Sequence, residues 1–307
     1  MIHEDLKHDF GYFISGCAPR PFAIDSLSTA ARPANWKKLF RFRESTVFRN
    51  SKGSQRICFF GSSFVEYNFR KRQCQIFCDD PAVLYETIYL VVLSYVGEQL
   101  GRMGAHRLHG FGFEMNGKGS VLLAPSGGGK STLALELLKA KRTRILSDDT
   151  PVIGKDGKMT AFPQRNPLKK VSGVGEEHLR RFKRHKHGEK IVIGSSFFGS
   201  QILAQANVDW LIVSKRTTKK QSSVRRVHKL NAILPLLKWL VVGYETPQIW
   251  QLYLRASPSD VIHKIGILTH RLQVAGQLFK NAQVAEIQLS TDPVESAHEL
   301  AEFMEHQ

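Results

Sequence analysis

Short apolar runs and longer helical stretches alternate along the chain, and the pattern is clearest in the middle. The apolar run Val121–Leu123 predicts a buried strand, and Thr132–Ala140 predicts a helix. A glycine-rich turn separates them. A further apolar strand, Arg144–Asp149, is expected next and ends in two adjacent carboxylates. The pattern therefore predicts a strand, a tight turn, a helix and a return strand in direct succession.

The N-terminal part carries aromatic and β-branched residues in short runs bounded by polar or glycine positions, which predicts a β-rich subdomain over residues 1–80. Its expected strands are Gly11–Cys17, Arg56–Phe60, Phe64–Phe69 and Gln73–Cys78. A helix, Pro81–Met103, and a strand, Leu108–Met115, are expected to follow. The turn Asn116–Gly119 then predicts a hairpin, because Asn-Gly stands between two apolar runs. We expect residues 81–307 to form the second domain.

The rest of the chain predicts an α/β fold whose C-terminal part is mainly helical. After a hairpin with its turn at Lys155–Lys158, the expected elements are a basic helix (Glu176–His187), a strand (Val208–Ser214), a basic loop (Lys215–Arg226), helices at Leu230–Val242, Pro247–Arg255 and Pro258–Lys280, a strand at Ala285–Leu289, and a last helix from Pro293. No repeat of 20–50 residues interrupts this order.

The glycine-rich turn has the chemistry of a phosphate cradle. The window Ala124–Ser131 fits the nucleotide-binding pattern G-x-x-x-x-G-K-[ST], except that alanine stands first. Glycines let backbone N–H groups point inward, Lys130 is expected to reach the β- and γ-phosphates, and the Ser131 hydroxyl to ligate Mg²⁺. The flanking strand and helix favour this reading over a glycine turn without a ligand. The predicted nucleotide-binding residues are Ser126, Gly127, Gly128, Gly129, Lys130, Ser131 and Thr132, with ATP and Mg²⁺ as cofactors.

Two carboxylates follow at a useful distance. Asp148 lies eighteen residues after Lys130, which is enough for one helix and a return strand. A strand adjacent to the glycine-rich turn would place Asp148 and Asp149 beside the metal and the γ-phosphate. One carboxylate could then hold the metal through water, and the other could accept a proton from an attacking hydroxyl. The alternative is a common Asp-Asp-Thr-Pro turn after a strand.

These motifs together resemble a known family. His109-Gly, then Pro-Ser-Gly-Gly-Gly-Lys-Ser-Thr-Leu, then Ser-Asp-Asp, are similar to the catalytic core of HPr kinase/phosphorylase and its relatives, which include serine kinases of lasso peptides. The resemblance covers about residues 108–165. It implies a P-loop on a mixed sheet, the fold shared with phosphoenolpyruvate carboxykinase. It also implies that Asp148 is the catalytic base and that Asp149 assists Ser131 in binding Mg²⁺.

The resemblance gives two further residues a role. His109 would sit beside the carboxylates or the transferred phosphate, and Arg165 is the candidate for neutralising charge on the transferring phosphoryl group. The Glu-x-Arg-Gly-x-Gly signature of the bifunctional enzymes has no match here, and Phe162–Arg165 occupies that region. HPr as substrate, phosphorylase activity and a hexamer are therefore not implied. The resulting prediction is a kinase acting on a serine of a peptide, protein or small metabolite.

The net charge bears on the kind of partner, and the cysteine content bears on the redox state of the protein. Forty-four Lys and Arg against 27 Asp and Glu give a net charge of +17 over 307 residues, which attracts anions, so an acidic peptide is one acceptor that fits. Four cysteines do not make a disulfide framework at this length and are expected to be reduced. The N-terminus has no apolar signal region, and no segment is long enough to span a membrane. We expect a cytoplasmic protein, compatible with a homo-oligomer.

Two other functions remain open at this point. Transporter-type ATPases have a glycine-rich loop of similar sequence. However, no Leu-Ser-Gly-Gly-Gln-like stretch is present, and the acidic pair follows the loop too closely for that class. A nucleotide-gated regulatory protein that binds nucleic acid is motivated by the basic segments 180–186 and 215–226, although aromatic residues do not interleave them. The identity of the phosphate acceptor, and whether the protein also removes phosphate, stay open.

Overall fold

A computed structural model describes residues 6, 9–10, 23–28, 36–42, 45–49, 55–59, 63–68, 73–139, 143–164, 166–168, 174–184, 188–193, 199–246 and 258–307. The chain forms two compact units. Unit 1 comprises residues 1–98, 181–191 and 247–262, and unit 2 comprises residues 99–180, 192–246 and 263–307. The predicted division at residue 80 stays a prediction, because these units are defined by internal contacts rather than by independent folding.

Unit 1 is built on a six-stranded sheet with the order β1-β6-β5-β4-β3-β2. Its strands are β1 (Ala23–Leu27), β2 (Lys37–Phe42), β3 (Ser45–Arg49), β4 (Gln55–Phe59), β5 (Ser63–Asn68) and β6 (Gln73–Phe77). Neighbouring strands from β2 to β6 are antiparallel, and β1 joins β6 in parallel. Three predicted strands are confirmed as β4, β5 and β6, whereas the expected strand Gly11–Cys17 lies outside the described residues.

Helix α2 (Pro81–Arg102) packs on this sheet and completes the core of unit 1. It begins after Asp80, whose Oδ1 accepts hydrogen bonds from the backbone N–H groups of Ala82 and Val83 and so caps two groups that the helix cannot pair itself. Three of the four cysteines, Cys58, Cys74 and Cys78, are buried here as free thiols. Burial raises the pKa of Cys78, so these thiols serve packing rather than reactivity.

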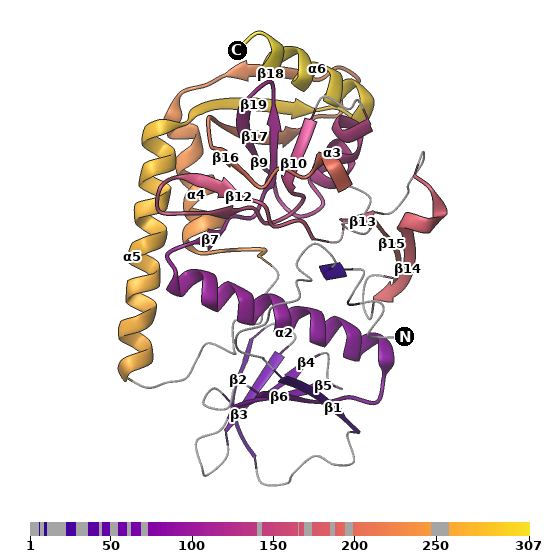
Figure 1. Ribbon diagram of the computed structural model, residues 1–307, viewed down its shortest axis with the longest axis vertical. Coiled ribbons are helices and arrows are strands. Elements are labelled where there is room, and N and C mark those ends of the chain that lie inside the picture. The colour runs from indigo at the N-terminus through magenta and orange to yellow at the C-terminus, as the bar shows by residue number, and fades with distance from the viewer. Residues whose placement is uncertain are drawn as a thin grey trace. The chain divides into compact units, whose positions relative to one another are not determined.

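The centre of unit 2 is a six-stranded mixed sheet with the order β10-β8-β9-β17-β19-β18 (Figure 1). The strands are β8 (Phe111–Met115), β9 (Lys118–Leu123), β10 (Thr143–Ser147), β17 (Trp210–Arg216), β18 (Ser223–Arg226) and β19 (Gln283–Leu289). Strands β9, β17 and β19 are parallel, while β8, β10 and β18 are joined by antiparallel pairs. The predicted hairpin is present, with Asn116 and Gly117 at positive φ in its turn.

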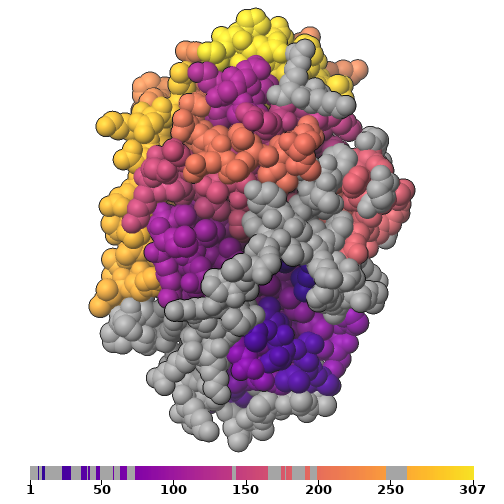
Figure 2. All heavy atoms as spheres, in the orientation of Figure 1, coloured from indigo at the N-terminus to yellow at the C-terminus, as the bar shows by residue number. Residues whose placement is uncertain are grey.

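Apolar residues of this sheet alternate between two covered faces. On β9, Leu122 enters the core under α3 (Lys130–Lys139) and α6 (Pro293–Glu305), whereas Val121 and Leu123 enter the core on the other face. That second core contains residues of α4 (Ile233–Leu236), the π-helix η7 (Leu237–Val241) and α5 (Pro258–Asn281). The two-residue period of a strand thus feeds two helical layers, as Figure 1 shows. In Figure 2 the yellow helix α6 forms part of the outer surface.

Two smaller sheets complete the described fold. One has the order β16-β12-β11-β7 and the other β13-β15-β14. Their strands are β7 (His106–Arg107), β11 (Val152–Ile153), β12 (Lys158–Thr160), β13 (Asn166–Leu168), β14 (Leu179–Arg184), β15 (Gly188–Ile193) and β16 (Gln205–Asn207), and short 3-10 turns lie at η3 (Glu176–His178), η5 (Gly199–Gln201) and η6 (Lys229–Ala232). None of the helices in these described ranges is both long and apolar enough to cross a membrane.

Three expectations from the sequence are wrong. The predicted basic helix Glu176–His187 is a 3-10 turn followed by strand β14, because basic residues three and four apart would repel one another along a helix face. The basic loop Lys215–Arg226 contributes its ends to β17 and β18, where Val224 packs against the core. The acidic strand β10 pairs with β8 instead of β9, because the β8–β9 hairpin places β8 between them. The expected helix Pro247–Arg255 lies outside the described residues.

Burial of His106 on β7 predicts a pH dependence of stability. The side chain is 2% exposed, and burial together with the nearby cations of Arg271, His270 and Lys155 lowers its pKa to about 4. Since an unfolded histidine has a pKa near 6.5, the unfolded chain takes up this proton first, and stability is lost as the pH falls from about 6.5 towards 4. We expect the unfolding free energy to fall by about 2 kcal/mol between pH 7 and pH 5 from this group alone.

Urea denaturation of the wild type and of His106→Gln at both pH values measures this effect, and His298→Gln on the exposed face of α6 is the control. An equal loss of stability in the wild type and His106→Gln would contradict the assignment.

Candidate functional site

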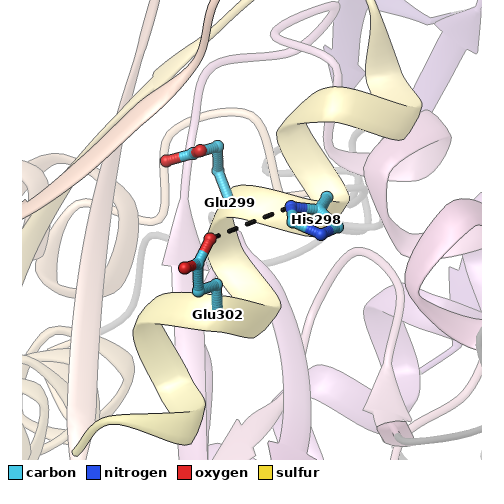
Figure 3. Close-up of side chains that lie close together, drawn as sticks. All are labelled: His298, Glu299 and Glu302. Carbon is cyan, nitrogen blue, oxygen red and sulfur yellow. Dashed lines mark ion pairs between the residues drawn. The ribbon is translucent and has the colours of Figure 1, made fainter.

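Two groups of residues with ligand-forming side chains lie in the described part of unit 2. The first is on α6, where His298, Glu299 and Glu302 have their ligand atoms within 4.8 Å of one another (Figure 3). His298 Nδ1 lies 3.9 Å from Glu302 Oε2, which is an exposed pair one helical turn apart. All three come from one helix, and exposed acidic groups are common without a metal. This group is therefore a surface ion pair and not the candidate site.

The second group surrounds the glycine-rich loop, residues 124–129, which joins β9 to α3. Gly127 and Gly129 adopt φ values of +73° and +93°, a region that other residues rarely enter. A side chain at Gly128 would place its Cβ 2.8 Å from the Pro125 carbonyl oxygen. A Cβ at Gly127 would meet nothing within 4 Å. The loop therefore needs its glycines, and it leaves open space at its tip.

Sheet geometry places the carboxylates at the same edge as this loop. Strand β9 ends at Leu123, directly before the loop, and β10 ends at Ser147, directly before Asp148 and Asp149. Because β10 and β9 are each antiparallel to β8, they run in the same direction and end at the same edge. The arrangement that the sequence predicts is reached with one intervening strand.

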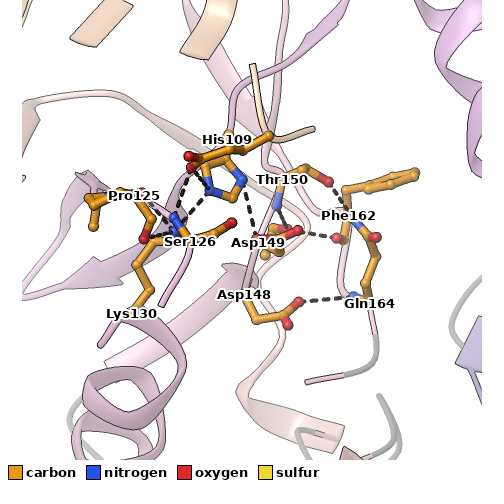
Figure 4. Close-up of polar contacts among 12 residues, drawn as sticks. His109, Pro125, Ser126, Lys130, Asp148, Asp149, Thr150, Phe162 and Gln164 are labelled. Atoms are coloured by element: carbon orange, nitrogen blue, oxygen red, sulfur yellow. Dashed lines mark hydrogen bonds and ion pairs between the residues drawn. The ribbon is translucent and has the colours of Figure 1, made fainter. Parts of the chain in front are cut away.

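Lys130 turns back on the loop instead of extending into solvent. It is 5% exposed, and its Nζ donates hydrogen bonds to the carbonyl oxygens of Ala124 at 2.7 Å and Pro125 at 3.1 Å. The same Nζ lies 3.0 Å from His109 Nε2, as Figure 4 shows. Burial lowers the pKa of Lys130, and the carboxylates of Asp149 and Glu245 oppose that shift. The Lys130 Nζ thus has three acceptors within the protein.

His109 stands in the bend between β7 and β8 and is held on both sides. Its backbone N–H donates to the Trp239 carbonyl, and the next residue, Gly110, donates to the Asp149 carbonyl at 2.9 Å. Burial lowers the pKa of His109, so the ring is neutral at pH 7. Because Lys130 donates to Nε2, the ring proton belongs on Nδ1, which lies 3.3 Å from Asp149 Oδ1. His109 therefore lies between the lysine and Asp149, with its Nδ1 close to the carboxylate but not hydrogen-bonded to it.

Asp148 points away from Asp149 and into the protein. It is 1% exposed, and its Oδ1 accepts a hydrogen bond from the backbone N–H of Gln164 at 3.2 Å (Figure 4). Its Oδ2 is buried and has no hydrogen-bond partner. Burial, reinforced by the charge of Asp149, raises the pKa of Asp148 well above its usual range. This buried oxygen has no partner, and the raised pKa means that the carboxylate has a higher proton affinity than an exposed one.

A short polar network fixes the turn that carries both aspartates. Ser147 Oγ donates to the Phe162 carbonyl at 2.8 Å and accepts from the Thr150 backbone N–H at 3.1 Å. The Gln164 side-chain amide donates to Thr150 Oγ1. The segment 162–164 therefore supports the acidic turn from the side opposite to Lys130. These hydrogen bonds fix the orientation of the Asp148 side chain.

The predicted metal-binding residues, Ser131 and Asp149, are both partly accessible. Asp149 is partly exposed, with 31% of its side chain accessible, and Ser131 is half-buried in the first turn of α3. A hydroxyl and a carboxylate form the hard oxygen donor set that Mg²⁺ takes, usually together with water and phosphate oxygens. Thr132 follows in the same turn, exposed to solvent, and Ser126 lies at the exposed tip of the loop. Arg165 lies outside the described residues.

Two residues of the site escape sequence reasoning. Glu245 Oε2 accepts a hydrogen bond from the Ser126 backbone N–H at 2.8 Å and lies 3.3 Å from His109 Nε2. Arg216, at the end of β17, directs Nη1 towards the Gly127 carbonyl oxygen at 3.4 Å. Both lie far along the chain from the loop, and no local motif marks them. In the sequence, Arg216 falls within the predicted basic loop Lys215–Arg226, which has no site motif.

Basic residues near Arg216 are partly neutralised within the sheet. Glu286 on β19 pairs with two of them. Its Oε2 lies 2.5 Å from Lys215 Nζ, and its Oε1 lies 2.9 Å from Arg225 Nη2. These hydrogen bonds lower the pKa of Glu286. Arg226 stacks over the Trp210 ring, with 5.3 Å between its guanidinium carbon and the ring centroid. Part of the basic segment 215–226 therefore holds the edge strand β18 in place.

Comparisons with known proteins give little further guidance. No family model matches the chain, and no curated protein is similar to it in sequence. Among solved structures, the chain is similar to the Hpr(Ser) kinase/phosphatase from Coxiella burnetii, with a TM-score of 0.30 and 11% identity, over 65% of this chain and 95% of that one. A score this low carries no argument about function, so the proposal below depends on the site itself.

Proposed function

We propose that this protein is an ATP- and Mg²⁺-dependent kinase that transfers the γ-phosphate to a hydroxyl, with a serine of a peptide, protein or small metabolite as the acceptor. The observation that carries the proposal is the grouping of Lys130, His109 and Asp149 with the buried, unpartnered oxygen of Asp148 at one sheet edge, beside a glycine-rich loop. Groups that bind phosphate and a group that accepts a proton are what phosphate transfer to an alcohol requires.

Each residue has a distinct part in this reaction. The loop residues Ser126 to Gly129 and the N-terminus of α3 bind the phosphates, and Lys130 neutralises their charge. Ser131 and Asp149 would hold Mg²⁺, which would supply positive charge to offset that of the phosphates. Asp148 takes the proton from the acceptor hydroxyl while the hydroxyl oxygen bonds to the γ-phosphorus. The bond between the γ-phosphorus and the oxygen that bridges it to the β-phosphate breaks, which releases ADP.

His109 and the arginines tune the charge around the phosphates. Neutral His109 lies between Lys130 and Asp149 and adds no charge of its own to the site. Arg216, whose guanidinium reaches the loop at Gly127, is placed to contact phosphate oxygens as they accumulate charge, a part that we also assign to Arg165. The acceptor binds beside Asp148, and the excess of positive charge favours an acidic one. Buried reduced thiols and the use of ATP fit a cytoplasmic enzyme.

The test is incubation with γ-labelled ATP and Mg²⁺ against a graded set of acceptors, from free serine to acidic serine peptides. We expect label to appear on at least one hydroxyl-bearing acceptor and to depend on Mg²⁺. Omission of Mg²⁺ and replacement of serine by alanine in the peptide are the controls. Release of inorganic phosphate alone, with every acceptor unlabelled, would contradict a kinase and favour hydrolysis.

A further inference from the structure

Glu245 holds an unusual backbone position next to the glycine-rich loop. It follows the π-helix η7 and adopts φ +66°, one of two positive values among the described non-glycine residues, the other being Asn116 in a hairpin turn. A long side chain in this conformation costs free energy, which asparagine and glycine largely avoid. Such positions persist where surrounding contacts hold them, and they cluster at ligand clamps and switch regions. The contacts that hold Glu245 come from its carboxylate.

The Glu245 carboxylate makes contacts of the kind that a phosphate would make. Its Oε2 accepts the Ser126 backbone N–H at 2.8 Å, lies 3.3 Å from His109 Nε2 and interacts electrostatically with Lys130. Its side chain is 19% exposed, so it lies largely within the site. A loop N–H and a lysine ammonium are the groups that bind phosphate oxygens in a loop of this kind. The Glu245 carboxylate already accepts the loop N–H, and its negative charge already attracts the lysine ammonium.

Lys130 is committed in the same way. Its three N–H donors meet Ala124 O, Pro125 O and His109 Nε2, which leaves none for a ligand. A phosphate entering the loop has to exchange these partners and remove the carboxylate, because two anions cannot share one N–H donor at close range without strong repulsion.

We propose that Glu245 is an internal anionic plug: its carboxylate accepts a loop N–H in place of a phosphate oxygen, and nucleotide binds by displacing it. The proposal rests on the proposed nucleotide-binding function and adds a residue that sets affinity. The apparent affinity of the loop is reduced by the fraction of molecules in which the carboxylate is in place. The Glu245 carboxylate competes with phosphate and not with the adenine base. It therefore weakens the binding of ATP and of inorganic tripolyphosphate by the same factor.

The experiment measures dissociation constants by titration calorimetry for ATP, tripolyphosphate and adenosine, with and without Mg²⁺. Glu245→Gln removes the charge and keeps the side chain, while Glu245→Gly removes the side chain and suits the positive φ, so it also guards against a folding defect. Glu302→Gln, on the exposed face of α6, is the matched control. We expect both Glu245 variants to bind ATP and tripolyphosphate about five- to tenfold more tightly, with equal ratios and with adenosine unchanged.

Each outcome decides between the two proposals. Tighter binding in both variants, or binding that appears only in the variants, supports the plug. Unchanged affinity in variants of a wild type that binds ATP overturns the plug and leaves the nucleotide function standing. Weaker ATP binding confined to solutions with Mg²⁺ also overturns it and makes Glu245 a metal ligand. Absence of ATP and tripolyphosphate binding in the wild type and both variants overturns the plug and the kinase together.

Discussion

Replacing Asp148 by asparagine is expected to lower the rate of phosphate transfer by about 10²- to 10⁴-fold, which is the usual contribution of a general base. Nucleotide binding should survive, because Lys130 and the loop are untouched. Asparagine keeps an oxygen for the Gln164 N–H but cannot take up a proton at the second position, where Asp148 Oδ2 has no partner. The measurement compares single-turnover transfer from γ-labelled ATP with ATP affinity in the same variant.

The pKa of Asp148 gives this prediction a second, independent readout. Its folded-state pKa is raised by burial, so the carboxyl contributes stability below its unfolded pKa that is lost as the pH rises through the folded value. The Asp148→Asn variant does not lose this stability at high pH, because asparagine does not ionise. We therefore expect the variant to be more thermally stable than the wild type at alkaline pH, with a smaller difference at acidic pH, although its transfer rate is much lower.

A merely structural role for Asp148 would give the opposite stability change. Asp156→Asn, in the exposed turn between β11 and β12, is the matched control and should keep both transfer and stability. Full transfer activity in Asp148→Asn would remove it as the base.

Sequence reasoning works best here where structure is local. The strand, glycine turn and helix at residues 120–140 appear in the structure as β9, the loop and α3, because three apolar residues, three glycines and a lysine specify them without help from elsewhere. Strand β14 shows the limit. Its basic residues have no helical apolar stripe, and pairing with β15, a later segment, decides its conformation.

The site shows the same division between local and distant information. The motif spacing predicts site roles for Lys130, Asp148 and Asp149, and the resemblance stated from the sequence predicts one for His109. The structure brings His109 to 3.0 Å from Lys130, twenty-one positions away along the chain. Glu245 stands 119 positions beyond Ser126 in a segment without a motif, so only the folded chain places its carboxylate on the loop. Sheet order is also non-local, which explains why β8 separates β9 from β10 against expectation.

Replacing Lys130 by alanine is expected to weaken ATP binding by about 10- to 100-fold, since a hydrogen bond from a charged donor contributes about 1.5–3 kcal/mol. Transfer at saturating ATP should fall on the order of 10²- to 10³-fold further, because the ammonium opposes charge that grows in the transition state. The measurements are ATP titration and single-turnover transfer. Lys139→Ala, at the exposed end of the same helix, is the control and should change neither.

The Lys130 variant also tests what the lysine contributes to stability when no nucleotide is added. Removal of the ammonium leaves the carbonyl oxygens of Ala124 and Pro125 without their charged donor and leaves Glu245 without its nearby cation. The variant should therefore be less stable than the wild type without nucleotide, and ATP should raise its melting temperature by less, because stabilisation by a ligand follows its affinity for the folded state. An ATP-dependent shift of wild-type size in Lys130→Ala would mean that the nucleotide binds elsewhere, and the loop would lose its assigned role.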